Sequence, residues 1–340
     1  MKKIFAMLCV LSVVSGLFAN GSKEVVAGGS AGGDSSKTYT LMFGHTLTEN
    51  DPYQKAFLKW AEAVKERTNG HVIIDVYANA QLGSEEDVIE QMRTGANIGW
   101  NTDSARLGNY VKSISVFNGP YCLESIDDVK KAQTLPLVQG WEQELADKYG
   151  LKVLSFAYVQ GYRNVISNKE VRKPSDLAGM KIRTAGAPIW QESVRAIGAT
   201  PVSLARSEIY SAAQTKAIDG LEDVYTAYAN AQLNEVLKVV SETHHIYLVN
   251  FSVCSAQWFN SLPKEYQDIL VEEADKAGYE ISDEIQKVSE ETKKTLMEKG
   301  VKIIPTSDID LEAFKAAGAK AYDVLGVSEA KDALLKALGK

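Results

Sequence analysis

The chain has few of the residues that build metal centres and redox sites. Its 340 residues include 3 cysteines and 4 histidines, and neither a Cys-x-x-Cys nor a His-Glu-x-x-His pattern occurs. His244 and His245 are adjacent, and adjacent residues of a strand point to opposite faces, so the two do not easily hold one ion. The sequence therefore predicts no metal site and no cofactor, and its catalytic signals are poor.

The chain also lacks a basic tract. It carries 44 acidic and 37 basic residues and a net charge of -7, which argues against nucleic acid as a partner. Two cysteines, Cys122 and Cys254, lie beyond the N-terminal segment. An exported protein could join them in a disulfide, whereas two buried free thiols are the reading that we favour from the sequence.

The N-terminus has the pattern of a secretory signal. Lys2 and Lys3 precede an apolar run over 4–14, and small residues follow up to Ala19. We predict cleavage after Ala19 and export to the periplasm; a signal that stays as an anchor is the alternative. The Gly- and Ser-rich segment 20–37 is expected to be a flexible leader.

Residues 38–340 show strands and helices in alternation, which predicts an α/β fold with a largely parallel sheet. The pattern changes near 158–162, and a new set of strands begins at Arg163, so we expect two domains. A charged helix over 264–299 would be about 50 Å long and would cross both domains. A coiled-coil dimer is the alternative for this helix, although its apolar pattern is too broken for regular heptads.

Arg183 ends a predicted strand over 180–183 and precedes a helix that opens near Pro188. A guanidinium at a strand end, facing helix N–H groups, is well placed to hold a carboxylate. The alternative is a surface arginine whose stem covers apolar groups.

Further charged residues follow other predicted strands, where ligands of α/β proteins collect. Several arginines there indicate an anionic ligand, and the aspartates indicate hydrogen-bond donors on it. Ion pairs among these residues themselves are the alternative. The residues are Asp103, Arg106, Arg163, Arg206 and Asp223.

Six motifs in this order resemble the extracytoplasmic solute-binding proteins of tripartite ATP-independent periplasmic (TRAP) transporters. The likeness runs over nearly all of 38–340. The motifs are Thr68-Asn-Gly-His-Val-Ile-Ile-Asp-Val-Tyr77, Gln81-Leu-Gly83, Lys173-Pro-Ser-Asp-Leu-Ala-Gly-Met-Lys-Ile-Arg183, Ile197-Gly-Ala-Thr-Pro-Val202, Ser207-Glu-Ile-Tyr210 and Ala217-Ile-Asp-Gly-Leu-Glu222.

The resemblance implies a two-lobed α/β periplasmic binding protein with hinge strands and a long helix that braces both lobes. Such proteins are not enzymes: they close on an organic acid and deliver it to membrane permease subunits that import it with sodium. We expect a monomer. The predicted parts are a signal peptide at 1–19, a leader at 20–37, lobe I at 38–161 plus about 249–288, and lobe II at 162–248 plus about 289–340.

The resemblance also assigns ligand-binding residues. Arg183 matches the arginine that forks the ligand carboxylate, and Arg163 matches a second arginine aimed at the same group. Asp103 and Arg106 match a site loop of sialic-acid-binding members, and His45 and Thr46 lie where the first strand reaches the cleft.

Two departures from the family pattern argue against sialic acid. This chain has Asp223 where many members carry an asparagine, and Arg206 where many carry an aromatic residue. A hydroxylated sugar acid, such as a uronate or an aldonate, is the ligand that we predict. An amino acid is the second reading, and a dicarboxylate or a phosphorylated acid, which Arg206 would favour, is the third. Two alternative functions from other classes of protein are a secreted hydrolase and a ligand-sensing module.

Overall fold

The computed structural model describes residues 37–340. The predicted signal and nearly all of the predicted leader lie outside these residues. The strands are β1 (Tyr39–Gly44), β2 (Val72–Tyr77), β3 (Ile98–Asp103), β4 (Leu151–Ser167), β5 (Lys181–Thr184), β6 (Thr200–Ser203), β7 (Gly220–Asp223), β8 (Val239–Ser255) and β9 (Lys302–Ile304). The helices are α1 (Pro52–Arg67), α2 (Glu85–Arg93), α3 (Ser104–Leu107), α4 (Ile126–Gln133), α5 (Pro136–Tyr149), α6 (Pro188–Ala196), α7 (Ile209–Gln214), α8 (Tyr225–Asn230), α9 (Ala256–Asn260), α10 (Lys264–Glu298), α11 (Leu311–Gly318), α12 (Lys320–Leu325) and α13 (Ser328–Leu338).

The strands of the described residues form one mixed sheet in the order β2-β1-β3-β8-β4-β7-β5-β6, with β9 beside β8. β1 pairs in parallel with β2 and β3, and β5 pairs in parallel with β6 and β7. β4 and β8 are antiparallel to each other, β8 is antiparallel to β3, and β4 is antiparallel to β7. The prediction of a largely parallel sheet is therefore wrong at its centre, where two long strands connect the parallel groups.

The predicted break near 158–162 is also absent, because β4 runs through it as one strand of 17 residues. Its pairing with β8 shifts register at several points, including one between Val159 and Gly161. A bulge interrupts the alternation of inward and outward side chains, and this interruption looks like a strand end in the sequence. The limits of the two lobes stay a prediction.

Helix α1 shows how the sequence sets a local structure. Asp51 caps it by accepting a hydrogen bond from the Tyr53 backbone N–H at 3.0 Å, and Pro52 occupies the first turn, where no intrahelical donor is needed. The buried face of the helix includes Phe57 and Trp60, spaced to lie on one side. These rings pack on β1 and close one part of the core.

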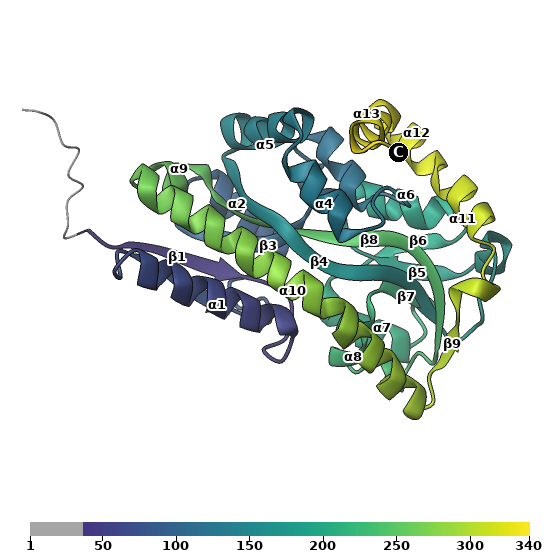
Figure 1. Cartoon of the computed structure of the whole chain (residues 1–340). Helices are drawn as coiled ribbons and strands as arrows, with labels where there is room; N and C mark the ends of the chain where they lie inside the picture. The colour runs from purple at the N-terminus through teal and green to yellow at the C-terminus, as the bar shows by residue number, and fades with distance from the viewer. Residues whose placement is uncertain (1–36) are drawn as a thin grey trace, which may run out of the picture. The chain divides into compact units, whose positions relative to one another are not determined.

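Helix α10 confirms the long helix expected from the sequence. It has 35 residues and contacts α1, β4 and α8, so it lies against elements from both groups of strands (Figure 1). The Trp60 indole donates to the Leu270 carbonyl at 3.1 Å, which joins α1 to α10. The Ser282 hydroxyl accepts from the Val159 N–H and donates to the Ala157 carbonyl, both at 2.7 Å, and thereby satisfies backbone groups that an irregular part of β4 leaves unpaired.

Cys122 and Cys254 are buried free thiols, as favoured from the sequence. Within residues 37–340, no group of three or more His, Cys, Asp or Glu side chains is arranged to hold a metal ion. None of the helices in this range combines the length and the apolar character that crossing a membrane requires.

Candidate functional site

A cleft of ≈ 810 Å³ opens where strands of both parallel groups end. The ends of β3 and β7 contribute Asp103 and Asp223, and β5 contributes Arg183 close to its end. Within each parallel group the carboxyl ends lie on one edge. The two groups run in opposite directions along β4 and β8, so their carboxyl ends face each other here. Seven of the eight predicted site residues line the cleft: Thr46, Asp103, Arg106, Arg163, Arg183, Arg206 and Asp223.

His45 is the predicted site residue that does not line the cleft. Its side chain is fully buried, its Nε2 lies 2.6 Å from Gln54 Oε1, and its ring packs 5.2 Å from the Phe57 ring. Burial lowers the pKa of His45, so the ring is neutral at pH 7. His45 belongs to the core beneath α1, and its neighbour Thr46 is the residue that reaches the cleft.

Arg183 is a buried cation that no carboxylate of residues 37–340 pairs with. It is 4 % exposed, and among the described residues no carboxylate lies within salt-bridge distance of it. Its Nε and Nη2 donate to the Leu204 carbonyl at 3.0 and 2.8 Å, so one edge of the guanidinium is occupied and the Nη1 side remains for a ligand. Burial is the main cause that lowers the pKa of Arg183 to about 9, and the positive charge of Arg206 is the second. A bound anion would raise this pKa, because it stabilises the charged guanidinium.

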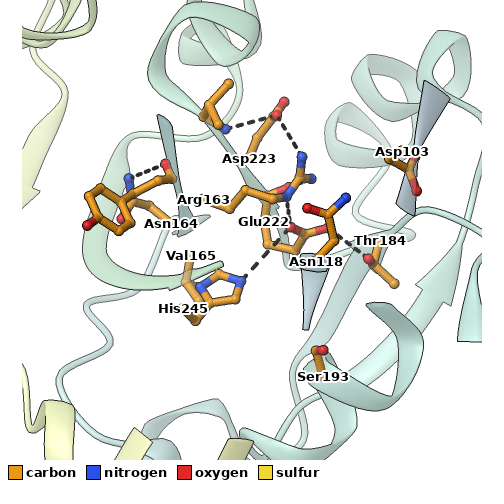
Figure 2. A network of polar contacts seen from close by, with 12 residues as sticks. Asp103, Asn118, Arg163, Asn164, Val165, Thr184, Ser193, Glu222, Asp223 and His245 are labelled. Carbon is orange, nitrogen blue, oxygen red and sulfur yellow. Dashed lines mark hydrogen bonds and ion pairs between the residues drawn. The ribbon is translucent and has the colours of Figure 1, made fainter. Parts of the chain in front are cut away.

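Arg163 is held by protein groups. Its Nε forms an ion pair with Glu222, its Nη2 donates to the Glu222 carbonyl at 2.6 Å, and its Nη1 lies 3.7 Å from Asp223 Oδ1. Figure 2 shows Glu222 lying among Arg163, Thr184 and His245. The Thr184 hydroxyl donates to Glu222 at 2.7 Å. Glu222, which sequence reasoning left out of the site, is therefore the principal partner of Arg163.

His245 does not balance the charge of Glu222. Its Nε2 lies 3.9 Å from Glu222 Oε2, a separation at which a protonated ring would form an ion pair. Burial first, and then the nearby charge of Arg163, lower the pKa of His245 to about 3. The ring is therefore neutral at physiological pH, and the charge of Glu222 is balanced by Arg163.

Arg206 and Asp223 form a further pair in the cleft wall. Arg206 Nη1 donates to Asp223 Oδ2 at 3.2 Å, and Nη2 donates to the Ala227 carbonyl at 2.9 Å. Burial would raise the pKa of Asp223, but the charges of Arg206 and Arg163 outweigh it and hold the pKa below its ordinary value. Asp223 is thus ionised, and this part of the cleft carries three arginines against two carboxylates.

Another part of the cleft wall is acidic. Asp103 and Glu86 pair with Arg106, and Glu85 Oε2 lies 3.5 Å from Arg106 Nη1. One arginine therefore faces three acids. The Trp190 ring lies beside both clusters, with the guanidinium carbon of Arg163 4.7 Å and that of Arg106 5.8 Å from its centroid.

Three buried atoms in the cleft wall have no hydrogen-bond partner among the described residues: Trp190 Nε1, Asn101 Oδ1 and Asn250 Oδ1. A buried polar group without a partner costs about 1–3 kcal/mol, which a ligand with matching groups would recover. Sequence reasoning missed all three residues. The position of Asn250 inside the apolar run over 246–251 was a signal that could have found it.

Glu85 makes the stability of the protein depend on pH. Burial is the main cause that raises the pKa of Glu85 from 4.5 to about 7. The charge of Arg106 acts against this rise, and the charge of Asp103 adds to it. The folded protein therefore binds this proton more tightly than the unfolded chain does, and stability falls as pH rises from about 4.5 to 7. This rise in pKa corresponds to a loss on the order of 3 kcal/mol.

Glu85→Gln should remove this dependence, so that the variant gains stability relative to wild type between pH 5 and pH 7.5 in urea unfolding. Glu86→Gln is the matched control. Burial alone would raise the pKa of Glu86, but the charge and hydrogen bond of Arg106 together with a backbone hydrogen bond lower it, so its contribution has the opposite sign. Parallel stability curves for wild type and Glu85→Gln would contradict the assignment.

Residues 43–328 match the family model of the bacterial extracellular solute-binding proteins, family 7. The chain belongs to this family. It is a TRAP solute-binding protein, a class that binds solutes and is not enzymatic.

The names of several relatives of this solute-binding protein state a ligand. The 2,3-diketo-L-gulonate-binding periplasmic protein of Escherichia coli is 29 % identical over 283 residues, which are 82 % of this chain and 84 % of the relative. A TRAP solute-binding protein of Actinobacillus succinogenes, solved with L-galactonate, is 27 % identical with a TM-score of 0.82, covering 88 % of this chain and 99 % of that one. One from Desulfovibrio salexigens, solved with diglycerolphosphate, is 28 % identical with a TM-score of 0.80, covering 88 % and 98 %.

Proposed function

We propose that this binding protein captures a small hydroxylated carboxylic acid, an aldonate or a uronate, in the periplasm and delivers it to a sodium-coupled TRAP permease. The observation that carries the proposal is Arg183, a cation 4 % exposed that has no carboxylate partner in the described part of the chain. A ligand carboxylate on its Nη1 side would supply the missing charge and form charge-assisted hydrogen bonds.

The charges around Arg183 favour a ligand with one negative charge. The nearby cations are Arg163, Arg183 and Arg206, and the nearby anions are Glu222 and Asp223. A single carboxylate balances this excess of one positive charge. A dicarboxylate or a phosphate would carry more negative charge than this excess balances. Arg206, which would favour such a ligand, already donates to Asp223 and to the Ala227 carbonyl.

The uncharged groups of the wall favour hydroxyls on the rest of the ligand. Asn101 Oδ1 and Asn250 Oδ1 are acceptors and Trp190 Nε1 is a donor, and a hydroxyl group can satisfy either kind. A simple fatty acid would leave all three unpaired. Asp223 or the acidic cluster around Arg106 could instead receive an ammonium group, which keeps an amino acid as the second candidate.

A matched panel tests the proposal by thermal shift and then by calorimetric titration. L-Galactonate and D-galacturonate should stabilise the protein, whereas hexanoate, which lacks the hydroxyls, and galactitol, which lacks the carboxylate, should not. Glutamate, succinate and glycerol 3-phosphate represent the other readings. Saturable binding of succinate or glycerol 3-phosphate with none of the sugar acids would overturn the proposal.

Asp223→Asn separates a hydroxyl from an ammonium on the ligand. An amide still accepts from a hydroxyl, so affinity for a sugar acid should change by less than about tenfold. Loss of a charge pair with an ammonium should cost about 2–5 kcal/mol, or roughly 30-fold and more. Calorimetry on the ligand from the panel decides between them, and Asp147→Asn, an exposed carboxylate on α5, sets the baseline.

A further inference from the structure

A second cavity, of ≈ 580 Å³, lies along β4, β8 and α10. Successive residues of β4 line the two spaces alternately. Tyr162 and Asn164 line the second cavity, and Arg163 between them lines the cleft. Because adjacent residues of a strand point to opposite faces, β4 is the wall between the two spaces. No step of ligand capture described above uses the second cavity.

One side of the second cavity is aromatic. The Tyr162 ring stacks on the His244 ring with 4.5 Å between centroids and lies 5.0 Å from the Tyr247 ring. The Tyr162 hydroxyl donates to the Glu124 carbonyl, which fixes the ring. Burial lowers the pKa of His244, so the imidazole is neutral at pH 7 and adds no positive charge. The faces of such rings attract cations.

The charged groups that line the cavity are mostly acidic: Glu124, Glu242, Asp283 and Glu290, against Lys293. Lys293 donates to Glu242 at 2.6 Å, and Lys340 lies 3.3 Å from Glu124. Among the described residues no cation lies within salt-bridge distance of Asp283 or Glu290. Two exposed carboxylates without a cation partner in residues 37–340 therefore lie beside the aromatic rings.

Gln160 supplies an independent sign that the cavity is incomplete. Its residue is 7 % exposed and lines both the second cavity and the cleft. In residues 37–340 its side-chain amide makes no hydrogen bond, and it is not among the fully buried polar groups, so the amide faces open space. A polar molecule in the second cavity would give this amide a partner.

We propose that the second cavity binds a small organic cation, an ammonium or guanidinium compound with an apolar body. The rings of Tyr162 and Tyr247 hold the body, Asp283 and Glu290 attract the charge, and the Gln160 amide bonds a polar group of the ligand. The site is separate from the acid-binding cleft, and its occupant carries the opposite charge.

The test uses phenethylammonium as the probe and 2-phenylethanol as its uncharged counterpart, with the exported protein and ligand-observed NMR. Phenethylammonium should bind saturably with a millimolar Kd or tighter, and 2-phenylethanol should bind more weakly. The double variant Asp283→Asn/Glu290→Gln should weaken phenethylammonium by about fivefold or more. The matched control Glu284→Gln/Glu291→Gln changes the same charge on the same helix at residues that are also exposed but do not line the cavity, and it should bind like wild type.

Arg183→Ala distinguishes this site from the cleft, because it should lose the acid and retain phenethylammonium. Absence of saturable binding would overturn the proposal, and so would an equal loss in both double variants, which would indicate general attraction to an acidic surface. Phenethylammonium could also compete with the sugar acid and fail to bind Arg183→Ala. This result would place the probe in the cleft and would overturn the proposal as well.

Discussion

Replacing Arg183 with alanine should weaken binding of the acid ligand by roughly 30-fold to a few thousand-fold, a cost of about 2–5 kcal/mol. Arg183 is the buried arginine of the cleft that no carboxylate of the described chain neutralises, so the ligand anion would lose its principal countercharge. The substitution also leaves the Leu204 carbonyl without the two N–H donors that it now receives. Calorimetric titration of the ligand from the panel measures the loss.

Arg183→Lys should restore little of this affinity. A single ammonium can replace the contact to Leu204 or the contact to the ligand, but it cannot present the parallel donors of a guanidinium in both directions. Arg172→Ala is the control, since Arg172 pairs with exposed acids away from the cleft. Wild-type affinity in Arg183→Ala would remove the main reason for regarding the ligand as an acid.

Glu222→Gln should produce the largest loss of stability, about 3 kcal/mol or more. The substitution keeps the shape of the side chain and an acceptor for Thr184, but it removes the charge that balances the buried Arg163. Breaking a buried ion pair at one partner typically costs about 3–5 kcal/mol. Asp223, 3.7 Å from Arg163, compensates in part and places the expected loss at the lower end of this range.

Urea unfolding measures this effect as a lower midpoint with an unchanged slope. Glu144→Gln is the matched control, because Glu144 pairs with Lys148 on the surface of α5, and such pairs contribute about 0–1 kcal/mol. A loss for Glu222→Gln no larger than that of the control would show that the charge of Glu222 contributes little to folding.

Local patterns were the part of the fold that could be read from the sequence. The strand expected over 180–183 and the long helix expected over 264–299 appear within one residue of these limits, as β5 and α10. The rule that ligands collect at strand ends selected Asp103, Arg106 and Arg206 from among many charged residues, and all three line the cleft. These inferences needed only neighbours along the chain.

Pairing between distant segments is what the sequence could not supply. Asp103 lies opposite Asn250 across an antiparallel pair, and nothing near either residue reveals that register. The same holds for Glu222, which Arg163 reaches from the adjacent strand. Bulges in β4 hid its continuity, because a local pattern cannot distinguish a displaced residue from the end of a strand.

The central strands also determine the order in which this protein can assemble during synthesis. β3 pairs with β8, with Gly99 opposite Cys254, so β3 leaves the ribosome long before the strand that covers its edge. An uncovered edge invites pairing with other chains, and contacts this distant in sequence slow folding. We expect a nascent chain that ends at residue 238 to show no cooperative unfolding, and the completed chain to refold slowly in stopped-flow fluorescence.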